Sequence, residues 1–65
     1  MHSYWKVTRN YITYNAGSVA DGYDVEIRSL ATPEARQRWI DHINEKLWAS
    51  EAAKGEFRQI VQQLT

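Results

Sequence analysis

The sequence predicts an α+β fold, with an N-terminal antiparallel β-hairpin or short three-stranded meander packed on one or two C-terminal amphipathic helices. Aromatic and β-branched residues concentrate in the first half of the chain, and apolar residues then recur at helical spacing towards the C-terminus. A Thr-Pro-Glu sequence, typical of a helix start, separates the two regions. Since 65 residues leave room for one small domain, we take 1–65 as a single unit.

The first strand region spans about residues 4–14 and is rich in Tyr, Trp, Val, Ile and Thr, which suit a pleated, half-buried surface. Its apolar alternation changes phase, because Trp5 and Ile12 lie on opposite parities. A single strand cannot bury both parities against one core. We therefore expect a bulge or a tight turn near Arg9-Asn10, and in the second case two strands instead of one.

A loop is expected over residues 15–22, where Asn, Ser, Asp and glycine favour unusual backbone angles. A second strand region follows over about residues 23–29. Here Tyr23, Val25 and Ile27 alternate with charged residues, which is the pattern of a strand buried on one face. We expect the two strand regions to pair in an antiparallel manner.

The helical region spans about residues 33–64. Thr32 can cap the N–H groups of the first turn, where Pro33 loses no hydrogen bond. One continuous helix of this length would be roughly 48 Å long, far longer than a domain of this size. We therefore favour a break near residues 50–55, with Gly55 as a C-cap, over one long helix packed on another subunit.

The predicted core joins the inner face of the strands to the apolar stripe of the helices. We expect it to contain Trp5, Val7, Val25 and Ile27 from the strands, and Trp39, Ile43 and Leu47 from the first helical segment. One core in a chain this short seldom supplies more than about 3–5 kcal/mol, and without cysteine there is no disulfide to add to it. Since self-association would provide the missing stability, we expect a homodimer.

Charge and composition exclude several functional classes. Lys plus Arg equal Asp plus Glu at 8 each, so the chain lacks the basic excess of a dedicated nucleic-acid binder. No stretch approaches the roughly 20 apolar residues of a membrane span, and the first residues contain no signal-peptide core. We expect no membrane association and a cytoplasmic location.

The sequence contains no recognisable pattern of catalytic, cofactor-binding or metal-binding residues. His42 and Glu45 are three residues apart and could share a helix face, but a metal site needs three or four converging ligands. The serines lie in termini, loops or caps without a neighbouring base. We therefore expect neither an enzyme nor a bound cofactor or metal.

Trp48 is the sequence's candidate for a partner-binding residue. On a continuous helix it lies roughly 180° from Trp39, on a polar face that includes Asn44 and Glu51. Nothing local would then cover the ring, and tryptophan is enriched at interface hot spots. The alternative is a bend near Ser50 that lets the second helix or the N-terminal segment cover Trp48.

The leading functional hypothesis is a non-enzymatic protein–protein interaction module, a small regulator, adaptor or inhibitor that acts by binding a larger protein. Small phage-like or mobile-element proteins often have this profile, but the sequence does not identify the protein partner. The alternative is a small nucleic-acid-binding protein in which strand aromatics stack on bases, although the balanced charge disfavours it. Its candidate residues are Tyr4, Lys6, Arg9 and Tyr11.

Overall fold

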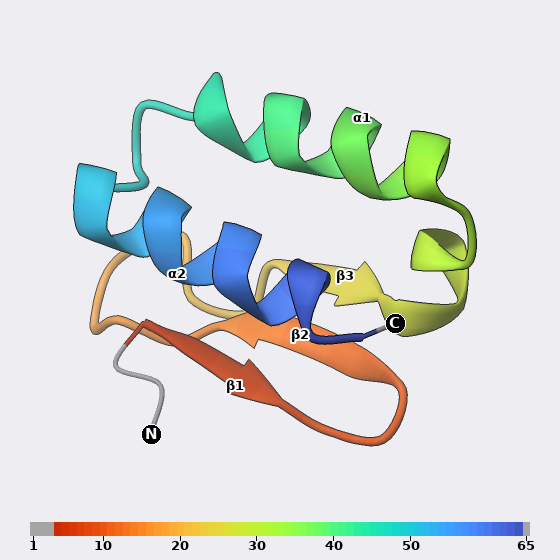
Figure 1. Cartoon of the computed structure of the whole chain (residues 1–65). Helices are drawn as coiled ribbons and strands as arrows, with labels where there is room; N and C mark the ends of the chain where they lie inside the picture. Colours follow the sequence, from red (N-terminus) through yellow and green to blue (C-terminus); the bar gives the residue numbers. More distant parts are fainter. Residues whose placement is uncertain (1–3, 65) are drawn as a thin grey trace.

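The structure is a computed structural model and describes residues 4–64. The chain folds into a three-stranded sheet followed by two α-helices. The strands form one antiparallel sheet in the order β1-β2-β3, and both α-helices lie on the same side of it (Figure 1). This confirms the α+β prediction, in its version with a three-stranded meander and two helices. The elements are β1 (Trp5–Val7), β2 (Tyr11–Tyr14), β3 (Asp24–Glu26), the 3₁₀ helix η1 (Ile27–Leu30), α1 (Pro33–Asn44) and α2 (Glu51–Gln62).

A tight turn between β1 and β2 explains the change of parity in the first strand region. The N–H of Thr8 donates to the carbonyl of Tyr11 at 2.8 Å, and the Thr8 hydroxyl accepts from the Tyr11 N–H at 3.1 Å. The turn contains Arg9 and Asn10, as the sequence predicts. Because the chain reverses there, the odd parity of β1 and the even parity of β2 face the same core.

The register of the sheet gathers its apolar side chains on the face that the helices cover. Trp5 is paired with Tyr14, and Ile12 stands between Val7 and Val25. All of these are buried except Val7, which is 40% exposed. Val7 was expected in the core, but it ends the edge strand β1, so only one neighbouring strand shields it.

β3 is shorter than the strand predicted over residues 23–29, because the chain turns into η1 directly after Glu26. The hydroxyl of Ser29 donates to the carbonyl of Glu26 at 2.6 Å and stabilises this turn. Ile27 therefore begins a 3₁₀ helix and is only half-buried. Leu30, at the end of η1, is the residue that enters the core instead.

The loop before β3 is closed by one carboxylate. Asp21 accepts hydrogen bonds from the N–H groups of Ala16 at 2.8 Å and Gly17 at 2.9 Å. Gly17 has a φ of 75°, a left-handed conformation that glycine adopts without strain. The donation from Ala16, with weaker support from Ser18 and Gly17, lowers the pKa of Asp21.

Each α-helix begins at a capping hydroxyl. Thr32 Oγ1 accepts from the N–H of Ala35 at 3.1 Å, and Ser50 Oγ accepts from the N–H of Ala53 at 3.2 Å. The first cap confirms the predicted start of the helical region. The second cap starts α2 anew, so the break lies over residues 45–50 and precedes most of the predicted interval.

Two predictions about the helical region are wrong. Gly55 is not a C-cap, since it lies within α2 a few residues after the Ser50 cap. Leu47 is not a core residue, because α1 has already ended and the side chain is 101% exposed in the connection. Both errors arise because the apolar periodicity continues through the break.

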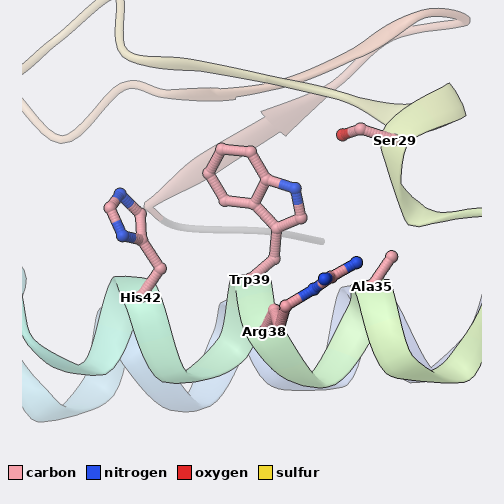
Figure 2. Close-up of a pocket in the computed structure, with 5 residues that line it drawn as sticks. All are labelled: Ser29, Ala35, Arg38, Trp39 and His42. Carbon is pink, nitrogen blue, oxygen red and sulfur yellow. The ribbon is translucent and has the colours of Figure 1, made fainter.

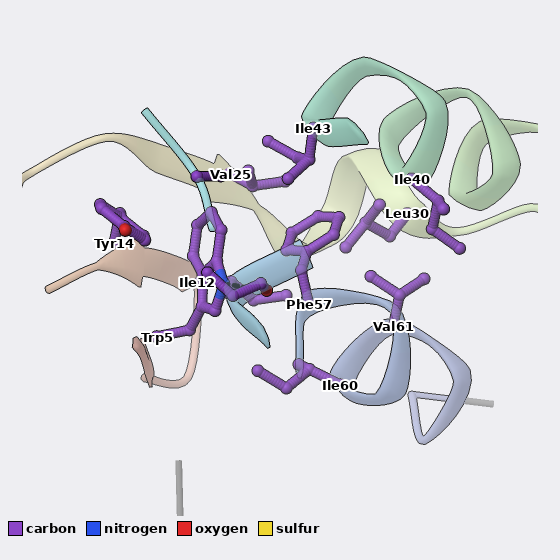
Figure 3. Close-up of a cluster of buried hydrophobic side chains, with 12 residues drawn as sticks. Trp5, Ile12, Tyr14, Val25, Leu30, Ile40, Ile43, Phe57, Ile60 and Val61 are labelled. Carbon is purple, nitrogen blue, oxygen red and sulfur yellow. Dashed lines mark hydrogen bonds between the residues drawn. The ribbon is translucent and has the colours of Figure 1, made fainter. Parts of the chain in front are cut away.

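The core fills the space between the inner face of the sheet and the two helices (Figure 3). Trp5 is central to it, with its ring centroid 4.9 Å from those of Tyr14 and Phe57 and its indole N–H donating to the carbonyl of Ala53 at 2.9 Å. Trp39, a predicted core residue, packs against the core but is only half-buried. The buried residues are Trp5, Ile12, Tyr14, Val25, Leu30, Ile40, Ile43, Ala49, Ala53, Phe57, Ile60 and Val61.

Candidate functional site

An open groove lies between α1 and η1 and has a volume of about 440 Å³. Trp39 projects from α1 into this space, and Ser29 of η1 lies across from the helix (Figure 2). We call it the Trp39 groove; the residues that line it are Ser29, Ala35, Arg38, Trp39 and His42.

The α1 side of the Trp39 groove is one stripe of the helix. Ala35 is four residues before Trp39 and Arg38 is four before His42, so the members of each pair lie above one another. Ile40 and Ile43, on the neighbouring face, are buried in the core. The groove therefore lies at the boundary between core and solvent, and its stripe consists of Ala35, Arg38, Trp39 and His42.

The rim of the groove is polar around an apolar ring. The rings of Trp39 and His42 meet edge to face with centroids 5.3 Å apart. His42 Nε2 also lies 3.2 Å from the hydroxyl of Tyr23, which directly precedes β3. Arg38 is exposed and has no ion-pair partner within residues 4–64. An apolar side chain of a ligand would thus meet the indole, with a cation close by.

The free edge of β3 adjoins this groove. The carbonyl of Tyr23 accepts from the N–H of Tyr14 in β2, and the N–H of Ile27 donates to the carbonyl of Asn10 just before β2, at 2.9 Å each. Backbone groups alternate along a strand, so those of Asp24 and Glu26 point away from β2. The carbonyl of Glu26 accepts from Ser29. The N–H groups of Asp24 and Glu26 and the carbonyl of Asp24 therefore line the free edge.

The outer face of the sheet, opposite the helices, carries both signs of charge. Lys6 and Asp24 flank Thr13 in one row across the strands. The Thr13 hydroxyl donates to the Asp24 carboxylate at 2.6 Å, and the Glu26 carboxylate lies 3.3 Å from the Arg28 guanidinium. These acids reduce the positive potential that phosphate binding requires.

The structure brings together two of the four residues proposed for nucleic-acid binding. Arg9 and Tyr11 line a second hollow of about 450 Å³, but Glu26 lines it as well. Tyr4 packs partly against the core and its N–H donates to Glu56 Oε2 at 2.9 Å. Lys6 stands on the outer face as described. The second hollow therefore joins Arg9 and Tyr11 but contains neither Tyr4 nor Lys6.

Trp48, predicted as an uncovered anchor, is half-buried in the connection between α1 and α2. Its ring centroid lies 4.7 Å from that of Tyr14, 5.1 Å from that of Tyr23 and 6.3 Å from that of Trp5. The helical-wheel placement is wrong because α1 ends before this residue, and the bend that the sequence offered as an alternative covers the ring. Its role in partner binding stays a prediction.

The other two predicted contact residues stand on either side of that connection. Asn44 ends α1 and Glu51 begins α2, and both are exposed. The side chain of Glu51 is 96% exposed, with Lys54 Nζ 3.8 Å from its carboxylate. They remain available to a partner, but they do not surround an exposed aromatic ring.

The two tyrosines nearest Trp48, Tyr14 and Tyr23, have raised pKa values. Burial raises the pKa of Tyr14, and the carboxylate of Asp21 and the ring of Tyr4 add to that effect. Burial likewise raises the pKa of Tyr23. Both hydroxyls stay protonated at neutral pH, and that of Tyr23 lies within hydrogen-bonding distance of His42.

Within residues 4–64, no three His, Cys, Asp or Glu side chains lie close enough to hold a metal ion. Over the same residues, both helices fall short of the length and hydropathy that crossing a bilayer requires. The polar groups of the Trp39 groove are a guanidinium, an imidazole and a hydroxyl, which suit recognition of a ligand by contact and hydrogen bonding.

The Trp39 groove is absent from the sequence-based predictions. Its stripe contains a tryptophan at helical spacing, which is most often a core position, and the flanking Arg38 and His42 were the only signal that the stripe reaches solvent. No family model matches the chain, and neither a curated protein nor a solved structure is significantly similar to it.

Proposed function

We propose that the chain is a non-enzymatic protein–protein interaction module, a small regulator, adaptor or inhibitor that binds a larger protein through the Trp39 groove. The observation that carries this proposal is a half-buried tryptophan ring at the centre of an open groove of about 440 Å³. Tryptophan and arginine dominate the binding energy of many interfaces, and here Arg38 lies next to Trp39.

The groove is a better candidate than the most exposed apolar side chains. Leu47 and Val19 are 101% and 104% exposed, but each stands alone on a connection or loop. Isolated apolar residues on a surface are ordinary and need no partner. A concave surface buries more apolar area per side chain than a single protruding residue does. The polar groups at its rim fix the orientation of the bound partner.

A pair of matched substitutions tests the proposal. Ala35→Gln extends a side chain into the groove, while the Thr32 cap keeps the Ala35 N–H that it binds. Ala52→Gln makes the same change at an exposed position of α2. Each variant and the wild type are immobilised and exposed to a lysate of the source cells, and the captured protein is then purified for calorimetry with all three chains.

We expect the wild type and Ala52→Gln to bind the captured protein equally, and Ala35→Gln to bind it at least about tenfold more weakly. Far-UV circular dichroism and melting curves of the three chains provide the control for folding. Equal binding by all three chains would place the contact elsewhere, with the Trp48 connection as the next surface to substitute.

A further inference from the structure

The free edge of β3 can hydrogen-bond one more strand. Its three outward backbone groups, the N–H and carbonyl of Asp24 and the N–H of Glu26, are the groups that an added strand would pair with. The groove that adjoins this edge extends from Ser29, just after β3, to His42, which meets Tyr23 just before β3. An extended segment laid along β3 therefore passes directly over the Trp39 groove.

The charges beside this edge indicate what such a segment carries. Asp24 and Glu26 are exposed on the outer face, whereas Val25 between them is buried on the inner face. Side chains across from the two acids would stand on the same outer face, where basic residues are favoured. The residue between them would face inward, where an apolar side chain meets Trp39 and a basic one would be repelled by Arg38.

A second copy of this chain fits the edge poorly. If two β3 strands met in an antiparallel manner, the central register would oppose Asp24 to Glu26. The neighbouring registers would oppose Asp24 to Asp24, or Glu26 to Glu26. Each of these registers places two carboxylates directly across from each other, which destabilises the pairing.

We infer that the partner inserts an extended segment as a fourth strand along β3, with basic side chains on the outer face and an apolar side chain between them in the Trp39 groove. This inference rests on the proposed function and names the chemistry of its partner. Backbone hydrogen bonds hold the segment, while the acids of β3 and the apolar groove select its alternating sequence.

Peptide probes and the ¹⁵N-labelled full chain test this inference. The probe is the capped peptide Ac-TKVKVKT-amide, and its matched control is Ac-TEVEVET-amide. We expect the lysine peptide to shift the backbone signals of Asp24 and Glu26 and the indole N–H signal of Trp39. We expect its affinity to fall as salt is added and to exceed that of the glutamate peptide by at least about fivefold.

Two further probes separate strand addition from attraction between charges. N-methylation of all three lysines removes the hydrogen bond to the carbonyl of Asp24 in every register and should abolish binding, whereas N-methylation of both valines, whose N–H groups point away, should leave it unchanged. The double substitution Asp24→Asn with Glu26→Gln keeps an acceptor for Thr13 and, because it also frees Arg28 from its ion pair, should remove the preference for the lysine peptide.

Three results would overturn the inference: no shift at Asp24 and Glu26 up to about 1 mM peptide, equal binding of the two peptides by the wild type, or insensitivity to N-methylation of the three lysines. Shifts of these signals with protein concentration alone would instead assign the edge to a second copy. If the peptides fail while Ala35→Gln still loses the captured protein, the groove function stands and only the fourth strand is wrong.

Discussion

At the scale of single residues, Trp5 connects the sheet to α2 through ring packing and one hydrogen bond. Because it is buried with aromatic rings at 4.9 Å, Trp5→Ala should cost about 3–5 kcal/mol of the free energy of unfolding. Trp39→Ala should cost less, about 2 kcal/mol, since part of that ring already faces water. Urea unfolding followed by circular dichroism measures both, with Trp5→Phe as a milder substitute if the alanine variant does not fold. A larger loss for Trp39 would place the centre of the core on α1.

Asp21 should make the stability of the fold depend on pH in the acid range. The N–H of Ala16, followed by those of Ser18 and Gly17, holds the pKa of Asp21 below its ordinary value of 3.8. A lowered pKa in the folded state stabilises the fold above 3.8, and this stabilisation is lost as the pH falls through the lower, folded pKa. Asp21→Asn should therefore lower the melting temperature at neutral pH, and the difference from the wild type should close in acid. A difference that is constant with pH would contradict the role of the charge.

At the scale of elements, the same substitution at two glycines should have opposite effects. Gly55 lies within α2, and a Cβ added there would meet no heavy atom within 4 Å. Gly55→Ala should therefore raise the free energy of unfolding by about 0.5–1 kcal/mol. Gly17 has a positive φ, so Gly17→Ala should lower it by roughly 1–2 kcal/mol. Destabilisation by Gly55→Ala would instead favour the C-cap that the sequence predicts.

The elements that the sequence predicts well are those with local causes. The change of parity between Trp5 and Ile12 identifies the β1–β2 turn, and Thr32-Pro33 identifies the start of α1. The end of α1 has no such local cause, because apolar residues continue through Leu47 at helical spacing. Because α1 ends before residue 48, the ring of Trp48 packs on those of Tyr14 and Tyr23. Such a contact between distant segments leaves no trace in a local pattern.

At the scale of the whole molecule, the candidate site depends on that same helix end. With one continuous helix, Trp39 belongs to the core and Trp48 to the surface. In the folded chain Trp48 is covered by three rings, while Trp39 keeps part of its surface in an open groove. The uncovered position that the sequence predicts for Trp48 is therefore wrong, whereas its role in partner binding stays a prediction. The predicted homodimer remains to be tested by sedimentation equilibrium at micromolar concentration.

The placement of the three tryptophans gives the protein an intrinsic optical reporter. Trp5 is buried and Trp48 is half-buried among aromatic rings, and neither lines the Trp39 groove. Trp39 borders water in the groove and meets the edge of the His42 ring. A ligand that enters the groove would displace that water and move the emission of Trp39 alone to shorter wavelength. The unlabelled chain can thus be titrated by fluorescence, and Trp39→Phe supplies the silent reference.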